Sequence, residues 1–239
     1  MTHNPLFSLV NEMVILFPCL LLIFTFNGFF KTLTAKIMGD TTAYNLGFLT
    51  FNPLAHIDLL GLFIILITYL LIGILFGEPF SKEMFCVIIL AFGSHMIIQP
   101  PINDAHFKYI RLGGLLTIFS GTFGNFLLAF LSALCLKGVI LLNLPYAVTL
   151  SFVMLFKTII NIAILFGILN LIPLPPFTGG HMLYYIVPTA YHRIIHQLEH
   201  YSLFIFFALF FLPGISETFF AFLSLCTMII KKMLLGFVL

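Results

Sequence analysis

The sequence predicts an all-α, polytopic membrane protein in which residues 1–239 form a single membrane-embedded domain with about six transmembrane helices. The first observation is composition: 62% of the residues are apolar and 8% are charged, whereas soluble domains average about 45–50% apolar and about 25% charged. The second is the distribution of those charges, which separate long apolar runs. The third is the net charge of +2, which is too weak to favour nucleic acid and leaves the lipid bilayer as partner.

The first span is predicted near the N-terminus. An uncharged run follows Glu12, and its helical pattern continues past Lys31 to a stop at Gly39 and Asp40. We therefore expect the C-terminal end of this helix to protrude from the hydrocarbon layer. Residues 41–58 are rich in Thr, Asn, Gly and Pro, which predicts a structured loop or a short β element.

Further apolar runs predict the remaining spans, and they cover residues 59–77, 84–98, 112–136 and 147–172. The run at 84–98 is short and is followed by two prolines, so it predicts either a thin span or a re-entrant segment. The last apolar region, residues 201–230, is interrupted by Pro213 and Gly214. It predicts either one kinked span or a hairpin of two short helices.

The basic residues indicate how these spans are oriented. Five of them fall on one side of the membrane when the first helix enters from outside: Lys31, Lys36, Lys108, Arg111 and Arg193. The positive-inside rule makes that side cytoplasmic. The localisation predicted from this is multi-pass, in a bacterial-type inner or plasma membrane.

A segment rich in helix breakers follows the run at 147–172. It reads Asn170-Leu-Ile-Pro-Leu-Pro-Pro-Phe-Thr-Gly-Gly-His181, and its prolines prevent the preceding helix from continuing. In a bilayer, irregular backbone is tolerated only where protein buries it or where it lines a wet cavity. The segment is therefore predicted to be a broken, re-entrant stretch beside a cavity, with an ordinary interhelical turn as the alternative.

The order of residues in this segment resembles the third motif of the site-2 protease family of intramembrane zinc metalloproteases, Asn-x-x-Pro-x-Pro-x-x-x-Gly-Gly. Three further stretches are similar to that family in the same order: Gly39-Asp40 with the Asn52-Pro53-Leu54-x-His56-Ile57-Asp58 that follows, Ser120-Gly121-Thr122-x-x-Asn125, and Leu198-Glu199-x-Tyr201. Thr122 stands where the family usually has proline. The resemblance implies the fold of that family, with its site toward the cytoplasmic side.

The same resemblance shows which residues are missing. Members of the family carry His-Glu-x-x-His before Gly-Asp, in which two histidines bind zinc and the glutamate is the general base. The corresponding residues of this chain are Asn27, Gly28 and Lys31, and Thr178 replaces the third ligand, an aspartate before Gly-Gly. These four residues are called the motif positions below.

The motif positions carry no imidazole and no carboxylate, so the resemblance implies a catalytically inactive pseudoprotease that needs no cofactor. Its expected partner is a membrane-protein or peptide client, bound within the bilayer as a transmembrane or extended segment. The alternative is an active intramembrane metalloprotease that binds zinc at a displaced site. A small transporter or channel is disfavoured, because the spans lack the paired ionisable groups that ion coupling generally needs.

Two amides and two prolines are candidates for contacting such a client. By the resemblance, Asn125 and Asn170 lie near the substrate. Together with Pro173 and Pro175 they could bind a peptide that adds beside the segment as an extra strand. The alternative for the two amides is that they hydrogen-bond between helices.

The histidines offer a possible displaced metal site. His192, His196 and His200 recur every four residues, so they share one helix face, which is either a polar stripe at the membrane interface or a transition-metal site. His56 and His181 are expected to be structural, His181 through hydrogen bonds to loop carbonyls.

Lys31 also has two interpretations. Its ammonium group either faces the lost zinc position, where the Asn27 amide and the Thr178 hydroxyl would solvate it, or extends to the membrane interface along its aliphatic stem.

Overall fold

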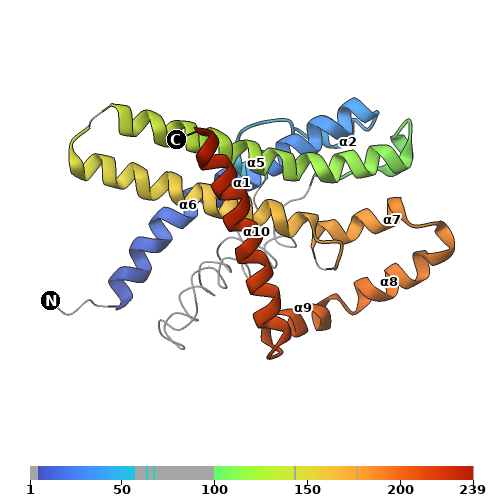
Figure 1. Cartoon of the computed structure of the whole chain (residues 1–239). Helices are drawn as coiled ribbons and strands as arrows, with labels where there is room; N and C mark the ends of the chain where they lie inside the picture. The colour runs from blue at the N-terminus through green and yellow to red at the C-terminus, as the bar shows by residue number, and fades with distance from the viewer. Residues whose placement is uncertain are drawn as a thin grey trace.

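The computed structural model describes residues 5–56, 63, 67, 100–142, 144–175 and 177–238, with side chains from Val14 onward. Within these residues all regular structure is helical (Figure 1). The spans predicted at 59–77 and 84–98 lie outside the described residues, apart from two single positions.

Among the described residues, four helices are long and apolar enough to cross a membrane: α1 (Pro5–Met38), α5 (Ile110–Leu141), α6 (Tyr146–Leu171) and α10 (Ile215–Val238). The shortest has 24 residues, and at about 1.5 Å per residue it exceeds the hydrocarbon thickness of about 30 Å. These helices confirm an all-α membrane protein. The span predicted at 147–172 corresponds to α6 within one residue at each end, whereas α5 begins two residues before and ends five residues after the predicted 112–136. The total of about six spans stays a prediction.

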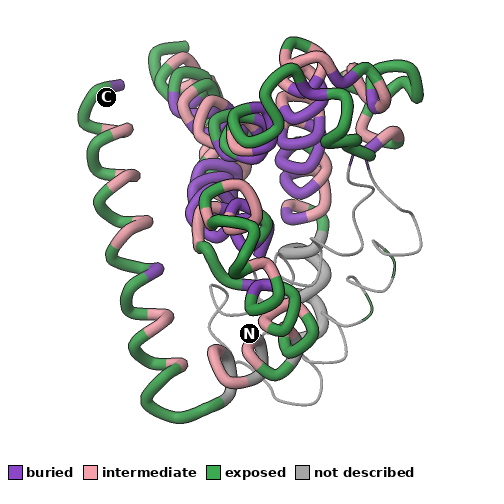
Figure 2. The backbone as a smooth tube through the Cα atoms, turned by 90° about the vertical axis from the view of Figure 1, so that its right-hand side faces the viewer, coloured by how far each residue is buried: buried purple, intermediate pink, exposed green. Residues whose placement is uncertain are grey.

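Helices α1, α5 and α6 form the core. The short connection at residues 142–145 makes α5 and α6 antiparallel neighbours, and nearly every residue of α6 from Ile159 to Asn170 is buried. Gly124 on α5 lets the backbones approach, because a Cβ there would lie 2.9 Å from the Phe26 carbonyl oxygen of α1. Figure 2 shows the buried residues concentrated on the central helices, whereas α10, ending at the labelled C-terminus, is exposed or half-buried along most of its length.

The connection after α1 is a structured loop. Gly39, at φ 115°, ends α1, and the short helices α2 (Thr42–Asn45) and η1 (Pro53–Ala55) follow. The β alternative predicted for this region is not found in residues 41–56.

The C-terminal third is a series of shorter helices before α10. They are η3 (Thr178–His181), α7 (Met182–Ile186), η4 (Thr189–Tyr191), α8 (His192–His200) and α9 (Ser202–Phe211). The predicted interruption of the last apolar region is a true break, because Gly214 adopts φ 83° between α9 and α10. At 10 residues α9 is too short to span a bilayer, so the region is two helices of unequal length and not one kinked span.

Candidate functional site

Three of the motif positions lie on one helix, near the middle of the contact between α1 and α5. Asn27, Gly28 and Lys31 are all buried, and Lys31 is only 4% exposed. The second interpretation of this lysine required its ammonium group to extend to the membrane interface. The burial of Lys31 contradicts that interpretation, because the group does not reach the surface of the protein.

The place of a side chain at Gly28 is filled by another residue. A Cβ at this glycine would lie 2.2 Å from Nδ1 and 2.8 Å from Cε1 of His56, well inside any real carbon contact. Nε2 of His56 lies 2.9 Å from the Thr50 carbonyl oxygen. Because a carbonyl only accepts, Nε2 carries the proton and Nδ1 faces Gly28 as an acceptor. Position 28 thus admits glycine and excludes a glutamate base.

The His56 ring is neutral in this setting. It is fully buried, and burial lowers its pKa below the ordinary value, an effect that the hydrogen bond to the Thr50 carbonyl only partly opposes. His56 was expected to be structural, and its position agrees. Its contact with Gly28 could not be predicted, because no pattern connects residues 28 positions apart across an irregular loop.

Lys31 and Asn27 meet the same glycine of α5. A Cβ at Gly121 would lie 2.7 Å from Lys31 Cε and 3.0 Å from Asn27 Nδ2. Beside it, the Ser120 hydroxyl donates to the Phe30 carbonyl over 3.1 Å. Asn27 and Lys31 therefore lie together against the helix that carries Ser120, Gly121 and Thr122.

Buried polar atoms without a hydrogen-bond partner gather around this contact. In the described part of the chain they are Asn27 Nδ2, His56 Nδ1, Thr122 Oγ1, both amide atoms of Asn125, Asn170 Nδ2 and, on α10, Thr227 Oγ1. Each such atom costs about 1–3 kcal/mol. Five of these seven atoms belong to α1, α5 and α6, the three helices that form the core.

The breaker-rich segment leaves the helix as predicted. After Ile172 the backbone turns through bonds from Leu174 N to the Ile172 carbonyl (2.8 Å) and from Phe177 N to the Leu174 carbonyl (3.0 Å). Gly179 is required at the re-entry, because a Cβ would lie 2.3 Å from the Ile172 carbonyl oxygen. Of the two predicted client-contacting prolines, Pro173 is exposed and Pro175 is buried.

Thr178, the fourth motif position, is buried at the start of η3. Within the described residues, the Thr178 hydroxyl makes no hydrogen bond to Lys31. Asn27 and Lys31, in contrast, lie together at Gly121. The predicted solvation of Lys31 by Asn27 and Thr178 stays a prediction, because Asn27 and Lys31 lie together at Gly121 without a hydrogen bond between them.

The histidines of α8 share a face but are engaged differently. His192 Nε2 lies 3.3 Å from the Val187 carbonyl oxygen, and its ring contacts Tyr184 edge-on. His196 and His200 are exposed. Across the described ranges no three His, Cys, Asp or Glu side chains are grouped closely enough to hold a metal ion.

His181 differs from its expected role. It pairs with a carboxylate, Glu199 of α8, at 3.3 Å between Nδ1 and Oε1, and not with loop carbonyls. Glu199 also accepts a hydrogen bond from the Tyr184 hydroxyl at 2.7 Å. Burial and the adjacent Glu199 raise the pKa of Tyr184 to about 12. Through His181 and Tyr184, Glu199 of α8 thus connects η3 and α7, the two elements that follow the breaker-rich segment.

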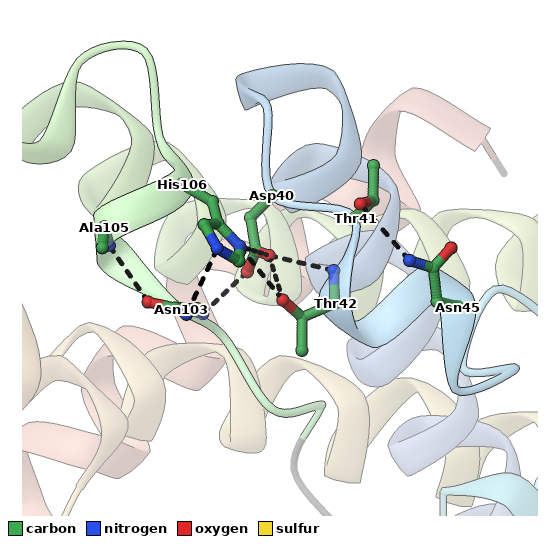
Figure 3. A network of polar contacts seen from close by, with 7 residues as sticks. All are labelled: Asp40, Thr41, Thr42, Asn45, Asn103, Ala105 and His106. Atoms are coloured by element: carbon green, nitrogen blue, oxygen red, sulfur yellow. Dashed lines mark hydrogen bonds and ion pairs between the residues drawn. The ribbon is translucent and has the colours of Figure 1, made fainter.

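A second polar network fixes the end of α1, at the Gly39-Asp40 motif (Figure 3). Asp40 is fully buried and accepts from the Thr42 amide (2.9 Å), the Thr42 hydroxyl (2.5 Å) and the Asn103 amide (2.7 Å). His106 Nδ1 lies 3.4 Å away. Burial raises the pKa of the Asp40 carboxyl, but these donors outweigh it and hold the pKa below its ordinary value. The network ties residues 100–108 to α1.

The chain is similar to a protein of Bacillus subtilis (strain 168) named "Putative zinc metalloprotease YwhC". The two are 28% identical over 202 residues, which cover 81% of this chain and 78% of the relative. No family model matches the chain, and no solved structure gives a significant match. The similarity supports a metalloprotease-like family for most of the chain.

Proposed function

We propose that the chain is a membrane-embedded pseudoprotease, a protease-like protein without zinc chemistry that binds transmembrane or extended peptide segments of client proteins. One observation carries the proposal: the space in which a side chain at Gly28 would begin is filled by the buried ring of His56. The position at which the family resemblance places the general base cannot accept one without rearrangement.

The remaining motif positions do not fit zinc. Zinc in proteins is held by thiolate, imidazole and carboxylate groups, whereas this chain offers an amide at Asn27, an ammonium at Lys31 and a hydroxyl at Thr178. A buried ammonium beside the vacated ligand position also repels a dication. Hydrolysis by this class of enzyme relies on the metal to lower the pKa of water toward about 7. The motif positions of this chain therefore support no such reaction step.

Client binding is supported by the polar groups that the core leaves unpaired. Both amide atoms of Asn125 and the Nδ2 atom of Asn170 are buried without a partner, and Pro173 with Leu174 lies on the surface where the backbone leaves α6. An extended client segment beside residues 173–175 would supply backbone groups to this region, as strand addition does elsewhere. The site side is proposed to be cytoplasmic.

A second candidate is an active metalloprotease with a displaced metal site, and the name of the Bacillus subtilis relative favours it. Metal analysis of the untagged, purified full-length chain separates the two. The pseudoprotease proposal expects far less than one zinc per chain. Stoichiometric zinc, or cleavage of a membrane substrate that a chelator abolishes, contradicts it.

Client binding itself can be tested by photo-cross-linking in vesicles. A photoreactive residue at Leu174 is expected to capture a single-span peptide in a saturable manner. The same residue at Met233, which is 71% exposed on α10, is the matched control and is expected to give only background. Equal capture at both positions contradicts binding at the segment.

A further inference from the structure

Three residues that depart from the family resemblance lie at one helix contact. Asn27 and Lys31 stand in the former zinc-ligand positions, and Thr122 stands where proline is usual. Asn27 Nδ2 and Lys31 Cε both meet Gly121, and Thr122 is the next residue of α5. The exposed fractions of the three side chains are 7%, 4% and 3%. Asn27 and Lys31 therefore meet at Gly121, and Thr122 is buried one position further along α5.

The hydroxyl of Thr122 is unusual for a helical threonine. Three other buried threonines of α1 and α5 return their hydroxyl to the carbonyl four residues earlier: Thr25 to Leu21 (2.6 Å), Thr32 to Gly28 (2.9 Å) and Thr117 to Gly113 (2.7 Å). Thr122 has no such bond. Its hydroxyl is available as a donor, as is Asn27 Nδ2, and the neighbouring Gly121 meets both Asn27 and Lys31.

The carboxylates that the structure describes are engaged elsewhere. Asp40 binds Thr42 and Asn103, and Glu199 binds Tyr184. Asp104 accepts from the Tyr185 hydroxyl, and Glu217 is exposed on α10. Lys31 forms no ion pair with any described residue. An ammonium group in a membrane span generally requires a partner that is negative or rich in acceptors.

We propose that Lys31, Asn27 and Thr122 bind a carboxylate within the membrane, carried by an acidic side chain in the transmembrane segment of the client. A cation and two neutral donors, with no competing acceptor from the described acids, match the charge and the lone pairs of a carboxylate. The identity of the source as a client rests on the proposed function. A free fatty acid carries the same group and is distinguished in the test.

The test uses the full-length chain in phosphatidylcholine vesicles and two single-span peptides that differ only in one central residue, Glu or Gln. Binding is followed by energy transfer from labelled protein to labelled peptide. The Glu peptide is expected to bind the native chain at least about tenfold more tightly, equivalent to about 1.4 kcal/mol. Lys31→Gln is expected to abolish that preference, whereas Lys157→Gln, at an exposed lysine of α6, is expected to keep it.

A second variant covers the case in which Lys31→Gln fails to fold. Asn27→Asp is nearly isosteric and places a carboxylate beside the ammonium, because both side chains meet Gly121. It is expected to be at least as heat-stable as the native chain and to lose the preference for the Glu peptide. An unchanged preference in Asn27→Asp overturns the proposal.

The outcomes separate the two proposals. Equal binding of the Glu and Gln peptides to the native chain overturns the carboxylate site and leaves client binding standing. If neither peptide binds, the client function fails. The carboxylate site is then judged with laurate alone: binding that depends on Lys31 supports a fatty acid as the source, and no such binding overturns the site.

Discussion

The sharpest prediction concerns Gly28→Ala. The added Cβ would lie 2.2 Å from His56 Nδ1 and 3.1 Å from its Cγ, so the ring must move as a whole. Because the ring is fully buried and holds the Thr50 carbonyl at 2.9 Å, its displacement also breaks that hydrogen bond.

The magnitude follows from three contributions. Overpacking of a core costs about 1–3 kcal/mol, and loss of the His56 hydrogen bond costs about 0.5–1.5 kcal/mol. Alanine is favoured over glycine within a helix by about 1 kcal/mol. The free energy of unfolding is therefore expected to fall by about 0.5–3.5 kcal/mol.

Thermal unfolding of the purified chain in detergent measures this effect. A chain of this size loses about 2–4 °C in Tm per kcal/mol, so a clear downward shift is expected. Gly138→Ala is the matched control, because a Cβ at Gly138 of α5 has no neighbour within 4 Å. That control should be neutral or slightly stabilised.

A double variant tests the cause of the shift. The variant that carries both Gly28→Ala and His56→Ala is expected to be destabilised by less than the sum of the two single substitutions. The difference is the coupling energy between the two positions. If Gly28→Ala is as stable as Gly138→Ala, or if the two effects simply add, the contact described here is refuted.

Three further predictions concern the remaining polar contacts. Asp40→Asn replaces an acceptor oxygen by a donor against the Thr42 and Asn103 amides and is expected to lower the free energy of unfolding by about 1–3 kcal/mol. Because the folded state lowers the Asp40 pKa, the carboxylate stabilises the native chain above the unfolded pKa of about 4 and loses this contribution as the pH falls through the lower folded value. Acid unfolding of the Asp40→Asn variant should therefore be flatter than that of the native chain over that window, and a parallel profile would contradict the assignment. Glu199→Gln removes a charge that raises the Tyr184 pKa, so spectrophotometric titration should find the tyrosinate midpoint below about 12. Restoring His, Glu, His and Asp at the motif positions is expected to give zinc binding by metal analysis only when His56→Ala is added. Zinc binding without His56→Ala would contradict the steric conflict between His56 and a glutamate at position 28.

The long helices could be predicted from the sequence because their ends are chemically marked. α6 begins after Pro145 and ends just before Pro173, and Gly39 ends α1. Proline and glycine act locally, so their effect does not depend on the rest of the fold. The same reason explains why the break near Gly214 was predicted but the lengths of α9 and α10 were not.

The contacts of the site could be predicted only in part. The family resemblance placed Asn27 and Lys31 at neighbouring motif positions, and the structure brings both to Gly121 of α5. The burial of Lys31 could not be decided, because a lysine seven residues before the end of α1 has a stem long enough for either outcome. The His181 pair with Glu199 depends on how α7 and α8 fold back, which no local pattern specifies.

The contact between His56 and Gly28 also bears on how this lineage can change. Any larger residue at position 28 collides with the ring, and removing the ring alone leaves the Thr50 carbonyl without its donor. A mutational path back toward a glutamate at position 28 therefore crosses a less stable intermediate whichever step comes first. Under the proposed function, the contact with His56 therefore opposes the return of a general base at position 28, and relatives with glutamate there are expected to pack the loop residue that corresponds to His56 differently.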